Sequence, residues 1–209
     1  NIGFFSNIVY TNYMFEIEIK AWARNRQEVI EKLNSFAEYI CSIDKDDTYY
    51  KFPVENEGKY VSFRIRKEKI IKNGVETSEN LFTYKKKENR ITEDGSSIEV
   101  NSENEFSFSD PLPLELLASD LGGKVYLKKR KITECWHFET ECGQANIELC
   151  TVLPLGDFLE IEIVTDREDS AWVSKIRSIE ESIFLKCGIP LSDEEPRYYS
   201  ELLKETVVS

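Results

Sequence analysis

The sequence is poor in the residues that build several common kinds of site. It has one histidine, His137, which excludes a metal centre made of several histidines and leaves a Ser-His-Asp triad dependent on that residue alone. Its cysteines are odd in number and include no Cys-x-x-Cys pair; they are Cys41, Cys135, Cys142, Cys150 and Cys187. This usage favours reduced thiols in a cytoplasmic protein over a disulfide framework or a thiolate zinc site. No apolar run approaches the roughly 20 residues that a membrane-spanning helix needs.

The chain also has only one methionine, Met14, which directly precedes a strongly alternating segment. Residues 1–13 lack the basic start of a signal peptide. We therefore expect Met14 to be the natural start and residues 1–13 to be an upstream or appended segment. The sequence contains neither an internal repeat nor a low-complexity linker, so we expect residues 14–204 to form a single domain.

Charge is the most unusual property of the composition. Charged residues make up 32% of the chain, more than the usual quarter, and the formal net charge is -12. A negative field of this size argues against nucleic-acid or anionic-membrane binding, because it does not attract phosphate. Local sorting of the charges can still create a basic pocket, so the positions of the charged residues matter more than their sum.

Hydrophobic periodicity predicts the order of the elements. Strict alternation predicts a strand over Phe15–Trp22. Helical spacing then predicts a helix through Ile40, followed by a short strand at Thr48–Phe52. Proline and glycine bound two more helices, over 110–123 and 170–188. The full predicted order is one strand, a helix, four strands, a helix, three strands and terminal helices.

Six of the predicted strands carry pairs of like charges at a spacing of two. The acidic pairs are Glu16/Glu18, Glu103/Glu105 and Glu160/Glu162, and the basic pairs are Arg64/Arg66, Lys85/Lys87 and Lys128/Arg130. A solvated sheet face explains any one pair, but such faces usually mix the signs because like charges repel. If helices cover the apolar faces, the charged faces line the interior of a closed or nearly closed sheet.

Such an interior requires a ligand, because each unpaired buried ion costs on the order of several kcal/mol. Carboxylates select a hard cation such as Mg²⁺ or Mn²⁺, and arginine and lysine suit phosphate oxygens. A lipocalin-like barrel for apolar ligands does not fit a charged interior. The pattern predicts an α+β fold, an eight-stranded, mostly antiparallel β tunnel closed as a barrel, with helices packed outside.

Several segments together resemble one known family. Glu16-Ile17-Glu18-Ile19-Lys20 resembles the ExExK signature of the CYTH, or triphosphate tunnel metalloenzyme, superfamily. Further segments follow in the family's order: Asp47–Tyr50, Phe63–Arg66, Thr83–Lys85, Lys128–Arg130, Leu155–Glu162 and Tyr199–Leu203. The resemblance covers about residues 14–204 and is nearest to the class IV adenylyl cyclase-like branch.

Membership implies a tunnel that binds a triphosphate with Mg²⁺ or Mn²⁺. It implies metal ligands at Glu16, Glu18, Glu160 and Glu162, and catalytic roles for Glu18 and Lys20. It implies substrate binding by Lys20, Arg64, Arg66, Lys85, Lys87, Lys128 and Arg130. The family chemistry is either cyclisation of ATP to cyclic AMP and pyrophosphate, or hydrolysis of a triphosphate such as tripolyphosphate or thiamine triphosphate.

One departure from the family keeps a second interpretation open. Many members carry an aspartate a short distance before Glu160, at a position that is Cys150 here, although Glu148 on the same face could substitute. This departure favours a catalytically silent module that senses a phosphorylated metabolite, whereas the intact acidic pairs favour an enzyme. The sequence does not choose among the triphosphates, and it leaves both a monomer and a homodimer open.

Overall fold

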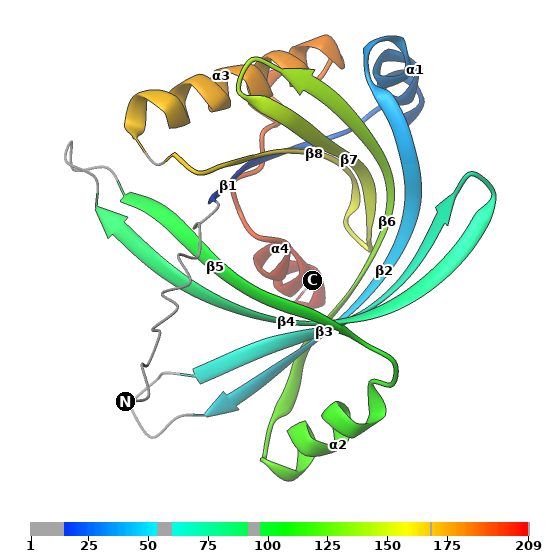
Figure 1. Ribbon diagram of the computed structural model, residues 1–209, viewed down its shortest axis with the longest axis vertical. Helices are drawn as coiled ribbons and strands as arrows, with labels where there is room; N and C mark the ends of the chain where they lie inside the picture. Colours follow the sequence, from blue (N-terminus) through cyan, green and yellow to red (C-terminus); the bar gives the residue numbers. More distant parts are fainter. Residues whose placement is uncertain (1–14, 54–59, 92–96, 168, 209) are drawn as a thin grey trace, which may run out of the picture.

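The computed structural model describes residues 15–53, 60–91, 97–167 and 169–208, and the side chains of residues 15, 85–103, 207 and 208 lie outside that description. Met14, the expected start, also lies outside it. The elements follow the predicted order (Figure 1). They are β1 (Phe15–Trp22), α1 (Arg26–Phe36), β2 (Glu38–Pro53), β3 (Tyr60–Lys72), β4 (Val75–Ile91), β5 (Ser97–Phe108), α2 (Leu112–Asp120), β6 (Lys124–Thr140), β7 (Gly143–Leu153), β8 (Gly156–Thr165), α3 (Ser170–Lys186), the short 3₁₀ turn η1 (Leu191–Asp193) and α4 (Tyr199–Val208).

The strands form one curved antiparallel sheet. Its order is β1-β8-β7-β6-β2-β3-β4-β5, and every neighbouring pair is antiparallel. The sheet bends so that the edge strands β1 and β5 come within 8 Å of each other between Cα atoms. No hydrogen-bonded ladder joins these two edges in the part of the chain that is described. The α+β class and the eight strands are confirmed, but the predicted closure into a barrel is not.

The strand that follows α1 is longer than predicted. We expected the first helix to continue through Ile40, but α1 ends at Phe36 and β2 begins at Glu38. β2 is a central strand that pairs with β6 on one side and β3 on the other. Backbone hydrogen bonds to two neighbours outweigh the modest helical propensity of this segment. The short strand predicted at Thr48–Phe52 is therefore the end of a 16-residue strand.

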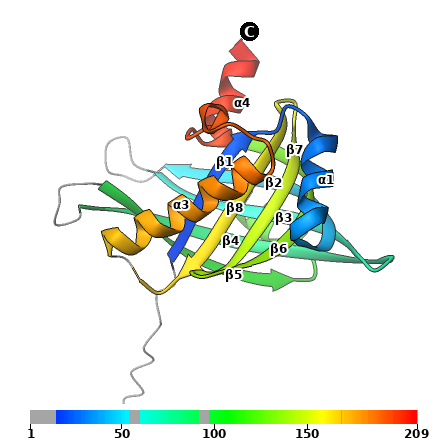
Figure 2. The same cartoon turned by 90° about the horizontal axis from the view of Figure 1, so that it is seen from above.

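The main core lies between α1, α3 and the apolar face of β1, β7 and β8, as Figure 2 shows from above. Ile161 and Ile163 of β8 pack with Ile176 and Ile183 of α3, and all four are fully buried. Burial of each such side chain stabilises the fold by roughly 1.5–3 kcal/mol. Because residues alternate along a strand, burial of these isoleucines turns Glu160 and Glu162 to the opposite face.

A second, smaller core lies on the outer face of β2–β5 under α2. Phe52, Phe63, Phe82 and Phe106 form a row of rings across neighbouring strands, with centroids 5.0 to 5.4 Å apart. Gly123, just after α2, lies against this row, and a Cβ there would sit 2.4 Å from the ring of Phe52. Glycine is therefore required for α2 to close over the rings.

The last helix does not pack outside the sheet as predicted. α4 lies at one end of the sheet (Figures 1 and 2). Its Leu202 and Tyr199 pack on Phe158, Cys150 and Trp22, which belong to the inner face there. None of the helices in the described ranges is both long and apolar enough to cross a membrane.

Candidate functional site

The inner face of the sheet encloses a cavity of about 1100 Å³. Among the described side chains, seven basic and seven acidic ones line it, so their formal charges cancel. The basic residues are Lys20, Lys45, Arg64, Arg66, Lys129, Lys131 and Arg177. The acidic residues are Glu16, Glu18, Glu148, Glu160, Glu162, Glu194 and Glu195.

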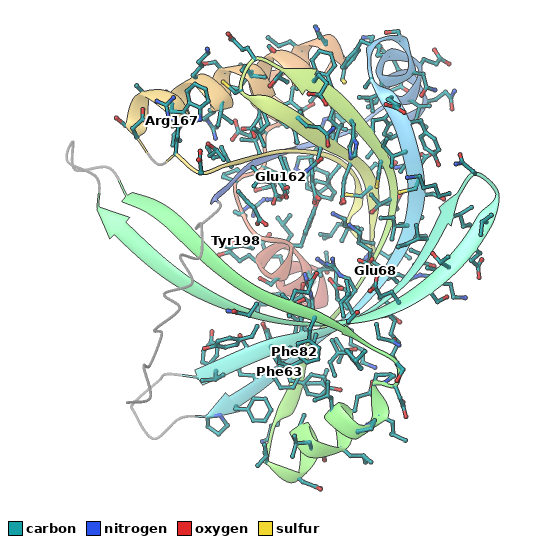
Figure 3. All side chains as sticks on the ribbon, in the orientation of Figure 1. Phe63, Glu68, Phe82, Glu162, Arg167 and Tyr198 are labelled. Carbon is teal, nitrogen blue, oxygen red and sulfur yellow. The ribbon has the colours of Figure 1, made fainter. Side chains whose placement is uncertain are left out.

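The charges that come from the strands are sorted by position in the sheet. β1, β8 and β7 are neighbours and carry what we call the acidic wall, which is Glu16, Glu18, Glu148, Glu160 and Glu162, with Lys20 of β1 as a cation among them. β6, β2 and β3 come next in the sheet and carry the basic wall, which is Lys45, Arg64, Arg66, Lys129 and Lys131. Figure 3 shows Glu162 inside the arch of the sheet, whereas Phe63 and Phe82 lie on the side of α2.

Like charges are crowded in the part of the acidic wall around Glu18. Glu18 is the register partner of Glu162, and Lys20 is the partner of Glu160. Burial, reinforced by the charges of Glu160 and Glu162, raises the pKa of Glu18 to about 7. Burial also lowers the pKa of Lys20. The lysines near these carboxylates do not fully offset the cost of ionising all of them together.

The part of the acidic wall around Glu148 is neutralised by lysines of the basic wall. Glu148 and Glu160 are register partners on β7 and β8, and the ammonium of Lys131 contacts both. The Lys131 Nζ atom lies 2.6 Å from Glu148 Oε2, and the Lys45 Nζ atom lies 2.7 Å from Glu148 Oε1. Burial alone would raise the pKa of Glu148, but the two ammonium groups lower it well below its usual value.

The basic wall contains its own counter-ion, Asp47. This carboxylate is fully buried and accepts two hydrogen bonds from Arg66, at 2.6 and 3.1 Å, while Lys129 lies 3.2 Å away. Burial alone would raise the pKa of Asp47, but the Arg66 hydrogen bonds and the nearby positive charges hold it well below its usual range. Such a bidentate, charge-assisted pair fixes the guanidinium of Arg66.

Arg64 is less completely satisfied than its neighbour. One of its terminal nitrogens donates to Thr83 at 2.9 Å and to Glu105 at 3.3 Å. Its Nε atom is buried and finds no hydrogen-bond partner among the described residues. A buried donor without an acceptor costs about 1–3 kcal/mol, so this position favours an added acceptor such as a phosphate oxygen.

Tyr199 of α4 lies between the two walls. Its hydroxyl donates to Glu160, and its ring centroid is 5.4 Å from the ammonium groups of both Lys20 and Lys129. The ring therefore interacts with one cation from each wall. The sequence segment Tyr199–Leu203 was part of the family resemblance, but no role in the site was predicted for Tyr199.

One pair of predicted site residues lies on the wrong face. Lys128 and Arg130 are exposed, and Arg130 binds Asp44 at 2.7 Å outside the cavity, whereas Lys129 and Lys131 line it. The cause is an irregularity in β6, since Leu127 pairs with Tyr49 but Val125 pairs with Tyr50. The extra residue between them resets the alternation of side chains. The assignment based on Val125 and Leu127 was therefore shifted by one residue.

The other predicted positions separate into two groups. Glu16, Glu18, Lys20, Arg64, Arg66, Glu160 and Glu162 all line the one cavity. The side chains of Lys85 and Lys87, in β4 beyond Thr83, lie outside the described residues. Lys45 and Asp47 were missed as site residues, although they share one face of β2 with Ile43 and Tyr49, because the strand was expected to begin only at Thr48.

Cys150, which stands where many family members have an aspartate, packs in an apolar cluster. It is fully buried beneath α4, opposite Phe158, with its Sγ atom 3.6 Å from the Tyr199 hydroxyl. Glu148, not Cys150, is the register partner of Glu160. The proposed substitution of Glu148 for the family's aspartate therefore agrees with the geometry. Among the described side chains, no group of three or more acidic, histidine or cysteine residues is arranged to hold a metal as it stands.

Comparison with solved structures identifies the fold. The PH1819 protein of Pyrococcus horikoshii is 26% identical to this chain, with a TM-score of 0.66 over 92% of this chain and 99% of that one. A proposed adenylate cyclase of Vibrio parahaemolyticus is 18% identical, with a TM-score of 0.65 over 91% of this chain and 98% of its own. The chain has the CYTH-like fold.

Another structure with this CYTH-like fold is HpAC1 of Hippeastrum, a proposed adenylyl cyclase described as having a dominant triphosphatase activity. It is 11% identical, with a TM-score of 0.58 over 92% of this chain and 96% of that one. No protein-family model matches the sequence, and no curated protein matches it. The CYTH-like fold is thus visible in the backbone and in short motifs rather than in overall sequence identity.

Proposed function

We propose that this protein is a divalent-metal-dependent enzyme that binds a triphosphate between the acidic and basic walls and catalyses phosphoryl displacement. The observation that carries the proposal is the sorting of a nearly neutral set of charges into two facing walls. A ligand that is itself an anion paired with a cation complements both walls at once. The similarity to proteins described as cyclase and triphosphatase supports the same class of substrate.

The basic wall provides the phosphate site. Arg66 is held in place by Asp47, and Arg64 offers the buried Nε donor described above. Lys129 and Lys131 approach from β6 on the other side of β2. Guanidinium and ammonium groups on adjacent strands form charge-assisted hydrogen bonds to successive phosphate groups of a chain.

The acidic wall fits a hard divalent cation. Its charged groups are carboxylates, which Mg²⁺ and Mn²⁺ prefer, and the pKa of Glu18 is raised by burial and by the charges of Glu160 and Glu162. The ammonium of Lys131 lies between Glu148 and Glu160, so one cationic side chain of the protein is already bound by this wall. Glu16, Glu18, Glu160 and Glu162 would hold the metal. A bound divalent ion would neutralise the phosphoryl oxygens in the transition state.

Lys20 has a position suited to the reacting phosphate. It is a cation within the acidic wall, opposite Glu160, and its ammonium also faces Tyr199. A triphosphate that spans the two walls places one end against Lys20 and the rest along the basic wall. In-line displacement by water or by a ribose hydroxyl depends on such positioning and charge stabilisation, and it needs no covalent nucleophile.

A binding module without turnover is the second candidate. The observation in its favour is the contact between Lys131 and Glu160, because a metal at Glu160 has to compete with that ammonium. The earlier argument from Cys150 no longer supports this candidate, because Glu148 occupies the position opposite Glu160.

A panel assay tests the proposal. ATP, tripolyphosphate and thiamine triphosphate are each incubated with Mg²⁺ or Mn²⁺, and both phosphate release and cyclic AMP are measured. Glu162→Gln keeps the size of the side chain but removes its charge, and it should lower turnover by about 100-fold. Glu139→Gln, at an exposed position on β6, is the matched control. Tight binding without turnover of any triphosphate would instead establish the binding module.

A further inference from the structure

The five cysteines occupy two kinds of environment. Cys142 and Cys187 are buried in the main core, and Cys150 is buried in the apolar cluster beneath α4. Cys41 and Cys135 belong to none of the apolar clusters and line the charged cavity. These two thiols alone among the five face a space that a small polar molecule can enter.

The same two cysteines face each other across neighbouring strands. Cys41 of β2 and Cys135 of β6 are register partners in the antiparallel ladder, and both side chains are buried. Opposed residues in such a ladder have Cα atoms roughly 4.5 or 5.5 Å apart. Both values lie within the range of roughly 4.4–6.8 Å that a disulfide spans. A bond between these sulfurs is therefore compatible with the spacing of neighbouring strands.

We propose that Cys41 and Cys135 are a redox site that forms a reversible disulfide in the cavity wall when a hydroperoxide enters. Cys41 attacks one peroxide oxygen, the O–O bond breaks, and Cys41 becomes a sulfenic acid as water or an alcohol leaves. Cys135 then attacks the sulfur of Cys41, the S–O bond breaks, and the hydroxyl leaves as water with the proton of the Cys135 thiol. Overall, the two thiols lose two electrons and two protons, and the hydroperoxide is reduced.

The surroundings assign the order of these two steps. Cys135 is the register partner of Glu148 on its other side, and burial together with that carboxylate raises its pKa well above the ordinary range. A protonated thiol is a poor nucleophile toward peroxide. Cys41 is therefore the residue that is oxidised first, and Cys135 is the resolving cysteine.

The disulfide can be detected independently of any triphosphate. The full chain is treated with hydrogen peroxide, denatured, alkylated and analysed by peptide mapping. We expect one linked pair of peptides that contain Cys41 and Cys135, with the other three cysteines alkylated. Linkage of strands so distant in sequence should also raise the thermal midpoint by about 10 °C, and dithiothreitol should reverse the shift.

Two variants keep the result interpretable. Cys41→Ala should abolish both the linked peptides and the rise in midpoint, and Cys135→Ala should do the same if the first variant folds poorly. Cys150→Ala removes a buried thiol outside the pair and should leave the linkage intact. Five alkylatable cysteines after oxidation, or linkage through any other cysteine, would overturn the proposal.

Discussion

The two walls of the cavity carry similar numbers of charges but are neutralised in different ways. In the basic wall, Asp47 lies among the cations on the same group of strands and binds both Arg66 and Lys129. In the acidic wall, Glu148 and Glu160 depend on Lys131, which reaches across from β6. Burial and the charges of Glu160 and Glu162 raise the pKa of Glu18, although Lys131 and Lys20 oppose the shift. The basic wall thus contains its own counter-ion. In the acidic wall, we expect a metal ion to be able to replace the ammonium of Lys131.

The largest effect is expected when the counter-ion of the basic wall is removed. Asp47→Asn leaves Arg66 and Lys129 buried without their carboxylate, which should lower the free energy of unfolding by about 3–5 kcal/mol. Urea denaturation measures the change. Asp46→Asn, an exposed neighbour on the same strand, is the control and should have little effect. Equal losses in the two variants would show that Asp47 has no special role.

Removal of the shared lysine tests the acidic wall. Lys131→Met should lower the free energy of unfolding by about 2–3 kcal/mol, less than Asp47→Asn, because Glu148 keeps Lys45 and Glu160 keeps Tyr199. Millimolar Mg²⁺ should then raise the thermal midpoint of the variant more than that of the wild type. If Mg²⁺ stabilises both proteins equally, Lys131 does not occupy a place that a metal can take.

Glu180 extends the shortage of positive charge into the core behind the acidic wall. It lies in α3, is fully buried, and its carboxyl oxygens have no hydrogen-bond partner among the described residues. Burial raises its pKa to about 9, with further contributions from Glu18 and Glu162, while Arg177 opposes the shift. The folded protein therefore retains a proton that the unfolded chain releases above its ordinary pKa.

This retained proton gives a pH dependence with a defined sign. Stability from the neutral carboxyl is complete below the unfolded pKa and declines as pH rises toward about 9. The range from pH 7 to 9 lies above the pKa of Glu18. Over this range the free energy of unfolding of the wild type should fall by roughly 1 kcal/mol per pH unit. Glu180→Met should flatten this profile and stabilise the protein at pH 8 by about 2 kcal/mol. An unchanged slope in denaturation measured across this range would contradict the assignment.

The smallest effect compares the two faces of β6. Lys129→Met should weaken the binding of tripolyphosphate by about tenfold, because it removes one charge-assisted contact from the basic wall. Lys128→Met removes an exposed lysine on the other face and should leave the affinity unchanged. Calorimetric titration measures both. A larger loss of affinity in Lys128→Met than in Lys129→Met would support the original prediction that Lys128 faces the cavity.

The order of elements could be predicted because most strands have one polar and one apolar face. Ile17 and Ile19 alternate with Glu16 and Glu18, and that contrast fixes both the strand and its orientation. Closure of the sheet could not be predicted in this way. Whether β1 and β5 pair depends on the twist and coiling of the whole sheet, which no single strand encodes.

The site could be predicted where the alternation is unbroken and failed where it is interrupted. Residues 128–131 are all basic, so the pattern of charge does not reveal which of them face inward. Only the pairing of Val125 and Leu127 with adjacent residues of β2 shows the bulge. Asp47 and Tyr199 were not recognised as site residues because their partners are distant in sequence, and their roles emerge only from those contacts.

The position of Trp22 gives the protein an internal optical reporter. Its ring lies 4.1 Å from that of Phe158, beneath α4, and its indole nitrogen contacts Glu195 in the segment that leads to that helix. The other two tryptophans are elsewhere: Trp136 of β6 donates to Asn34 of α1, and Trp172 of α3 donates to Thr165 of β8. With Trp136 and Trp172 replaced by phenylalanine, the remaining emission follows the surroundings of Trp22 alone. A change in packing at this end of the cavity therefore becomes visible as a change in fluorescence.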